Sequence, residues 1–100
     1  MKAKKDIKQF RAIGHKLKPV VTVAGNGLND NVMLELERAL TDHELIKVKL
    51  VVGDRPARES VSQEICSKTG AEIIQIIGNI VLLLRRSPEP DPRKSNLLRF

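Results

Sequence analysis

A glycine turn between two apolar stretches is the part of this sequence best suited to binding a ligand. Gly25, Asn26 and Gly27 follow the apolar run 20–23 and precede Asn29, a good helix cap. A strand that enters a helix through glycines presents backbone N–H groups beside the positive end of that helix. Such a turn favours an anion, and in a basic chain the expected anion is a phosphate group.

Four lysines could supply positive charge around that phosphate. Lys16 and Lys18 end a basic amino-terminal stretch, and Lys47 and Lys49 alternate with apolar residues in a second strand. Two residues on one face of a strand stand about 7 Å apart, near the phosphate spacing of an extended nucleic-acid single strand. The alternative interpretation is that these lysines are only solvated residues on an open surface.

The composition indicates one small, basic, globular domain. The chain has 100 residues, 41% of them hydrophobic, and a net charge of +6. This excess favours a polyanionic partner, although a basic protein without such a partner is the alternative. No apolar run approaches the ~20 residues that span a membrane, and the charged amino terminus does not resemble a secretory signal. We expect a cytoplasmic monomer that does not act at a membrane.

No group of residues in the sequence is typical of a catalytic or metal site. His15 and His43 are the only imidazoles, and neither belongs to a metal or nucleophile motif. Cys66 is expected to pack in the core, because no base or metal ligand lies at motif spacing from it. With two Phe, no Tyr and no Trp, the chain lacks aromatic platforms for stacking bases. We therefore expect no enzyme and no cofactor; a glycine loop that clamps backbone phosphates, as in KH domains, fits better.

The order of the predicted elements indicates an α/β two-layer sandwich, α-β-α-β-α-β-β, with a mixed four-stranded sheet. The predicted helices cover 4–17, 30–43 and 55–69, and the predicted strands cover 20–23, 45–52, 71–77 and 80–85. A helix joins the first two strands, which are therefore expected to be parallel. The last two form a hairpin through Gly78-Asn79. Four β-branched residues in a row, 20–23, suggest a strand that is covered on both faces.

The folded domain is expected to end near residue 86. Residues 87–100 contain three prolines within five positions, followed by the basic residues Arg93, Lys94 and Arg99, without a periodic apolar pattern. Such a composition predicts a flexible basic tail.

Several blocks of the sequence together resemble a known family. They are Gly14-His15-x-Leu17-x-Pro19-Val20-Val21, the glycine turn, His43 to Lys49, and Gln75 to Gly78 followed by an apolar strand that ends in Arg85. Over about residues 5–86 the chain resembles the YhbY family of stand-alone bacterial CRM (chloroplast RNA splicing and ribosome maturation) domains. The resemblance implies a fold similar to the carboxy-terminal domain of bacterial translation initiation factor three. It also implies RNA binding and association with precursors of the large ribosomal subunit.

The glycine turn departs from the Gly-x-x-Gly pattern of that family. Ala24 occupies the first glycine position, and the two middle positions, Gly25 and Asn26, carry no positive charge. Ala24 should weaken binding if its position needs a positive φ or a close approach to RNA, although Gly25 next to it could restore that freedom.

The sequence thus predicts a non-enzymatic RNA-binding protein that acts in assembly of the large ribosomal subunit. The residues expected to contact RNA are Lys16, Lys18, Gly25, Asn26, Gly27, Lys47 and Lys49. The alternative is a protein-interaction module that docks on a ribosomal protein or a translation factor.

Overall fold

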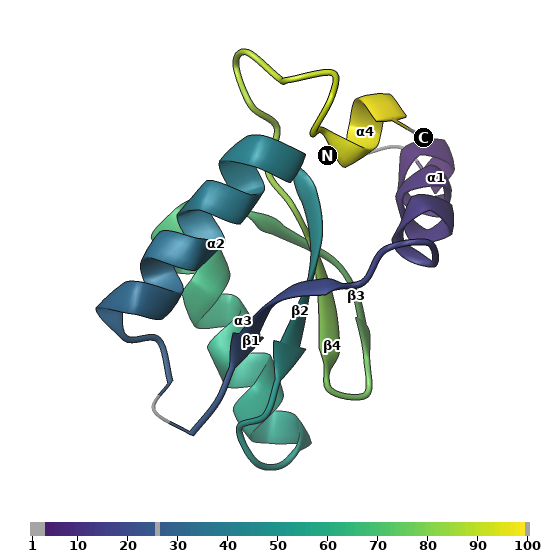
Figure 1. Cartoon of the computed structure of the whole chain (residues 1–100). Coiled ribbons are helices and arrows are strands. Elements are labelled where there is room, and N and C mark those ends of the chain that lie inside the picture. The colour runs from purple at the N-terminus through teal and green to yellow at the C-terminus, as the bar shows by residue number, and fades with distance from the viewer. Residues whose placement is uncertain (1–3, 26, 100) are drawn as a thin grey trace.

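The structure, a computed structural model, describes residues 4–25 and 27–99. In chain order its elements are α1 (Lys4–Gly14), β1 (Pro19–Val23), α2 (Asp30–His43), β2 (Leu45–Leu50), α3 (Arg55–Thr69), β3 (Glu72–Ile77), β4 (Ile80–Leu84) and α4 (Asn96–Arg99) (Figure 1). All the helices and strands that the sequence predicts are present, with ends that differ by a few residues. The short helix α4 was not predicted from the sequence.

Capping residues explain where the two longest helices begin. The side chain of Asn29 accepts a hydrogen bond from the Val32 amide at 2.9 Å, and that of Asp54 accepts one from the Ala57 amide at 3.1 Å. Each cap pairs an amide that the first turn of a helix leaves without a partner. Helix α3 ends at Gly70, whose φ of 78° is the left-handed conformation that glycine adopts without strain.

The sheet has the strand order β1-β2-β4-β3. Strand β1 is parallel to β2, while the β2–β4 and β3–β4 pairs are antiparallel. This arrangement confirms the predicted mixed four-stranded α/β fold and the hairpin between the last two strands.

Strand β1 lies at an edge of the sheet and is not covered on both faces, so that expectation is wrong. Val21 and Val23 are buried, whereas Val20 is 49% exposed and Thr22 is also exposed. The β-branched run correctly predicts a strand. It does not reveal that only one face of β1 packs against a helix.

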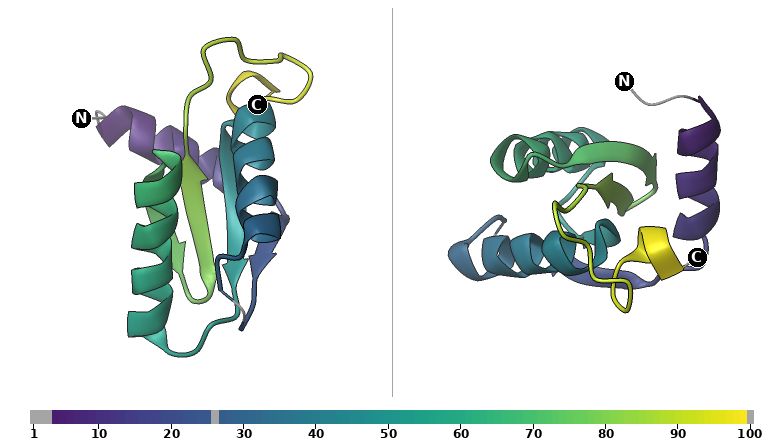
Figure 2. Two further views of the ribbon diagram at one scale, coloured as in Figure 1. Left: turned by 90° about the vertical axis from the view of Figure 1, so that its left-hand side faces the viewer. Right: turned by 90° about the horizontal axis from the view of Figure 1, so that it is seen from above.

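Helices lie on both sides of the sheet, so α1 adds a layer to the two that the sequence predicts (Figure 2). Helices α2 and α3 cover one face, over a core that includes Leu36, Ile65 and Val48. Helix α1 crosses the other face and packs through Phe10 and Ile13 on side chains of β2, β3 and β4. The part of this second face that α1 does not cover carries the lysines of β2, and it is called the open face below.

Arg85, directly after β4, joins the carboxyl ends of α2 and α3. Its Nη1 lies 2.7 Å from a carboxylate oxygen of Glu37 and donates to the Thr69 carbonyl at 3.1 Å. Its Nη2 donates to the Glu37 carbonyl at 3.3 Å and to the Thr41 hydroxyl at 3.0 Å. The arginine that ends the last strand therefore has a structural role in this chain.

The segment 87–99 differs from the expected flexible tail. Ser95 and Asn96 are buried, and Leu97 packs against the apolar cluster beneath α1. The Ser95 hydroxyl donates to a Glu44 carboxylate oxygen at 2.6 Å, and Asn96 donates to the Leu45 carbonyl at 2.7 Å. The contacts are mainly polar, so a search for apolar periodicity does not detect them.

Candidate functional site

Three of the predicted lysines surround one hollow of about 240 Å³ in the protein surface. It lies where the link between α1 and β1 meets the start of β2 and helix α4. The residues that line it are Lys16, Leu17, Lys18, Val20, His43, Ile46, Lys47, Asn96 and Arg99. We call it the basic hollow. Apolar side chains form part of its wall, and cations form much of the rest.

The strand register explains how distant lysines come together. Pro19 pairs with Lys47, so Lys18, directly before β1, lies near Lys47 in β2. Ile46 and Val48 point into the core beneath α2 and α3, which turns Lys47 toward the open face. The described residues that line the basic hollow include no Asp or Glu. A concave surface with one sign of charge and apolar walls concentrates its field on an incoming anion.

Lys49 lies two residues further along β2, on the same open face. Its register partner in β1 is Thr22, and its side chain is exposed. It extends the positive charge of the basic hollow along the parallel β1–β2 pair, toward the carboxyl ends of both strands.

The glycine turn lies at the far end of β1, away from the basic hollow (Figure 1). Gly25 lies six positions after Pro19, the partner of Lys47, which corresponds to about 20 Å of extended chain. Of the predicted lysines, Lys49 comes nearest to the turn. The seven predicted residues therefore do not form a ring around the turn. Asn26, one of the seven, lies outside the described residues.

The turn is open to solvent, but some of its donors are already used. A Cβ placed on Gly25 or Gly27 would meet no atom within 4 Å other than those of adjacent residues, so the space beside both α-carbons is open. Gly27 has a φ of 69°, and its N–H donates to the Ala24 carbonyl at 2.9 Å. Because Asn29 caps α2 and Asp30 adds a negative charge in its first turn, this helix end attracts an anion less than the sequence suggests.

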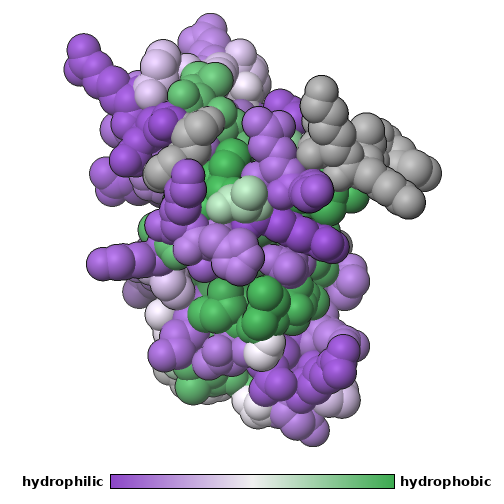
Figure 3. Space-filling view, turned by 90° about the vertical axis from the view of Figure 1, so that its right-hand side faces the viewer, coloured by the Kyte–Doolittle hydropathy of each residue, from purple (hydrophilic) through white to green (hydrophobic). Residues whose placement is uncertain are grey.

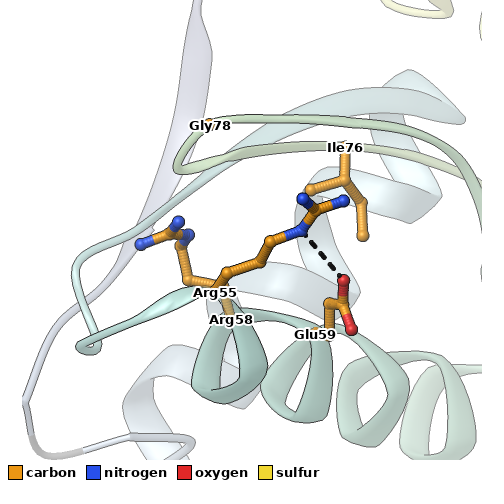
Figure 4. A pocket seen from close by; sticks show the side chains of 5 residues that line it. All are labelled: Arg55, Arg58, Glu59, Ile76 and Gly78. Atoms are coloured by element: carbon orange, nitrogen blue, oxygen red, sulfur yellow. Dashed lines mark hydrogen bonds and ion pairs between the residues drawn. The ribbon is translucent and has the colours of Figure 1, made fainter.

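A second hollow, of about 560 Å³, lies beside the start of α3 and is lined by Arg55, Arg58, Glu59, Ile76 and Gly78 (Figure 4). Both arginines make internal contacts there. The Nε of Arg55 lies 3.3 Å from a Glu59 carboxylate oxygen, and Nη1 of Arg58 donates to the Gly53 carbonyl at 2.9 Å. Glu59 therefore offsets part of the positive charge that the two arginines bring to this hollow.

Sequence reasoning did not select Arg55, Arg58, Asn96 or Arg99. The sequence does contain an indication of Arg55 and Arg58, because parallel strands have their carboxyl ends at the same end of a sheet. The residues after β2 thus lie at the same end of the sheet as the glycine turn after β1. At that end the Val51 amide donates to the Val23 carbonyl at 2.7 Å. Arg99 lies in a segment whose packing the sequence pattern does not indicate.

The open face also carries exposed apolar side chains. Ile77 is 57% exposed and, with Lys47, Gln75, Ile80 and Leu82, lines a shallow hollow of about 130 Å³. Apolar side chains gather on the lower half of this face, beneath a band of hydrophilic residues (Figure 3). Lysines beside apolar side chains suit a ligand that has both phosphates and bases.

The remaining titratable groups include two histidines and one cysteine. Within residues 4–25 and 27–99, no group of three or more His, Cys, Asp or Glu side chains could hold a metal ion. Burial raises the pKa of the Cys66 thiol, and the negative charge of Glu72 raises it further, so the thiol stays protonated at neutral pH. His43 donates from Nδ1 to the Lys94 carbonyl at 2.9 Å. Over the same residues, no helix is long and apolar enough to span a bilayer.

Comparisons with known proteins agree on one family. The family model described as the CRS1 / YhbY (CRM) domain matches residues 3–85. The chain is 50% identical over 93 residues to "Probable RNA-binding protein PA4753" of Pseudomonas aeruginosa, which covers 93% of the chain and 89% of that protein. It is 44% identical over 91 residues to an "RNA-binding protein" of Haemophilus influenzae, over 87% of the chain and 92% of that protein.

A solved structure has a similar fold. The solution structure of the hypothetical protein SAV1595 from Staphylococcus aureus superposes with a TM-score of 0.77 at 25% identity. The match covers 89% of this chain and 93% of that one.

Proposed function

Because the chain belongs to the CRS1 / YhbY (CRM) domain family, we propose that it is a non-enzymatic RNA-binding protein that acts in assembly of the large ribosomal subunit. Two relatives that match nearly the whole chain are named as RNA-binding proteins. The basic hollow is the observation that carries the proposal, because Lys16, Lys18 and Lys47 face one concavity whose described lining includes no acid. In this proposal the protein acts in the cytoplasm as a monomer.

RNA would follow the edge strand rather than surround the glycine turn. A phosphate in the basic hollow would contact Lys18 and Lys47, the next phosphates would approach Lys49, and the strand would continue toward Gly25. Along this route the RNA would meet the lysines first and the exposed backbone of the glycine turn afterwards. A row of cations that follows the sugar–phosphate backbone in this way suits single-stranded RNA, whose binding depends on charge more than on base identity.

The assembly role rests on the family resemblance, so it needs a test in cells. The experiment is ultraviolet crosslinking of the intact protein to RNA, followed by sequencing of the attached RNA. We expect the reads to be enriched in ribosomal RNA of the large subunit, clustered at a few positions. Reads spread over messenger RNA, or concentrated in the small subunit, would contradict the assembly role but not RNA binding.

Docking on a protein is the second candidate, and the exposed apolar side chains of the open face favour it. Val20 is 49% exposed and Ile77 is 57% exposed, on either side of Lys47 and Lys49. Exposed apolar groups beside charges are also typical of protein interfaces. The same crosslinking experiment separates the candidates, because a module that docks on a ribosomal protein or a translation factor would crosslink to little RNA.

A further inference from the structure

The segment that follows the family domain is fixed to the protein by one buried carboxylate. Glu44, 3% exposed, accepts hydrogen bonds from the Ser87 amide and from the Ser95 hydroxyl, each at 2.6 Å. It therefore holds both ends of the loop 88–94. Burying a carboxylate is costly unless donors compensate it, and here two donors do so.

Two further contacts set the position of α4 relative to β2. Asn96, which is buried, donates to the Leu45 carbonyl at 2.7 Å, and the Lys94 carbonyl accepts from His43 at 2.9 Å. Leu97 adds an apolar contact with the cluster beneath α1. Four consecutive residues, 94–97, thus contact the body of the domain.

This anchoring brings the last turn of the chain to the basic hollow. Asn96 and Arg99 line it together with Lys16, Lys18 and Lys47. The family model ends at residue 85, so α4 adds to the hollow a cation that lies beyond the matched domain. The other cations of the segment lie elsewhere: Arg93 is exposed, and Lys94 lies 3.9 Å from Asp42.

We propose that residues 87–99 form part of the RNA-binding surface. Glu44 and Asn96 fix α4 in position, so that Arg99 contacts a phosphate group of RNA held at the basic hollow. The inference rests on the proposed function, since it requires RNA at that hollow. It goes further by assigning a role to a segment outside the family domain. The other explanation of the contacts is that α4 only packs against the domain and does not contact RNA.

Charge reversal at two arginines of the same segment separates these explanations. Arg99→Glu changes a residue that lines the basic hollow, while Arg93→Glu makes the same change in charge at an exposed position outside it. The probe is a ~20-nucleotide single-stranded RNA of mixed sequence, measured by fluorescence anisotropy over a range of salt concentrations. Circular dichroism checks that each variant remains folded.

We expect Arg99→Glu to weaken binding about fivefold at low salt and to reduce the log–log salt slope by roughly 0.7, the value of one phosphate contact on a single strand. Arg93→Glu should change the slope by much less. If the two variants bind alike, α4 does not contact RNA and the inference is overturned.

Lys47→Glu, tested in the same series, distinguishes failure of the inference from failure of the proposed function. If Lys47→Glu weakens binding and Arg99→Glu does not, RNA occupies the hollow without help from α4. If neither variant weakens binding, RNA is not held at the hollow, and both proposals fail. If Arg99→Glu unfolds the chain, Arg99→Gln removes the charge with less perturbation and must still reduce the slope.

Discussion

Replacing Lys18 and Lys47 together by glutamate is expected to weaken RNA binding at least tenfold and to leave the fold intact. Both residues line the basic hollow, and Lys47 points away from the core beneath α2 and α3. Each replacement removes an attraction of about 1 kcal/mol at ~4 Å in water and adds a repulsion of similar size, before screening by salt. Affinity for a ~20-nucleotide single-stranded RNA, measured by fluorescence anisotropy, checks the prediction.

The salt dependence of binding should change with the affinity. If RNA makes about four phosphate contacts, the log–log slope of the wild-type protein should be roughly −3, and loss of two contacts should reduce it to about −1.4. The matched control is the double variant Arg38→Glu, Lys68→Glu, which changes the net charge equally on α2 and α3, across the sheet from the open face. Equal loss of affinity in both double variants would mean that overall charge, and not the basic hollow, attracts RNA.

Replacing Arg85 by alanine is expected to lower the free energy of unfolding by about 2 kcal/mol, or the melting temperature by roughly 10 °C. The arginine is 23% exposed, and its change would leave the Glu37 carboxylate and the Thr69 carbonyl without a donor that they now share. Thermal unfolding followed by circular dichroism measures the effect. RNA affinity of the folded protein should not change, since Arg85 does not line the basic hollow.

Arg86, the next residue, provides the control for this prediction. It is exposed, and its guanidinium lies 5.7 Å from the centre of the Phe10 ring. An exposed cation–π contact is worth about 0.5–1 kcal/mol, so Arg86→Ala should lower stability by less than half as much. Should Arg85→Ala instead weaken RNA binding and leave the melting temperature unchanged, the structural role of Arg85 would be wrong.

Local signals in the sequence predict the elements of the fold well. Asn29 caps α2 as expected, and α3 begins after Asp54 and ends at Gly70, residues typical of helix ends. Local signals do not give the order of strands in the sheet, because pairing depends on contacts between distant segments. The position of β1 at the edge, with Val20 exposed, follows from that order and not from the residues of β1.

The candidate site was predicted only in part, for a similar reason. Alternation in β2 correctly puts Lys47 and Lys49 on a face away from the main core. The separation between these lysines and the glycine turn depends on the register of β1 with β2, which the sequence does not specify. The contribution of Arg99 depends on a buried carboxylate, Glu44, whose partners lie more than 40 residues further along the chain.

Amide chemical-shift mapping during an RNA titration tests the central claim most directly. With a ~20-nucleotide single-stranded RNA, the largest shifts should occur at residues 16–18 and 47–49, with smaller shifts at 24–28. Amides on the outer sides of α2 and α3, around Arg38 and Lys68, should not move. Shifts confined to α2 and α3, with residues 16–18 and 47–49 unchanged, would contradict the account.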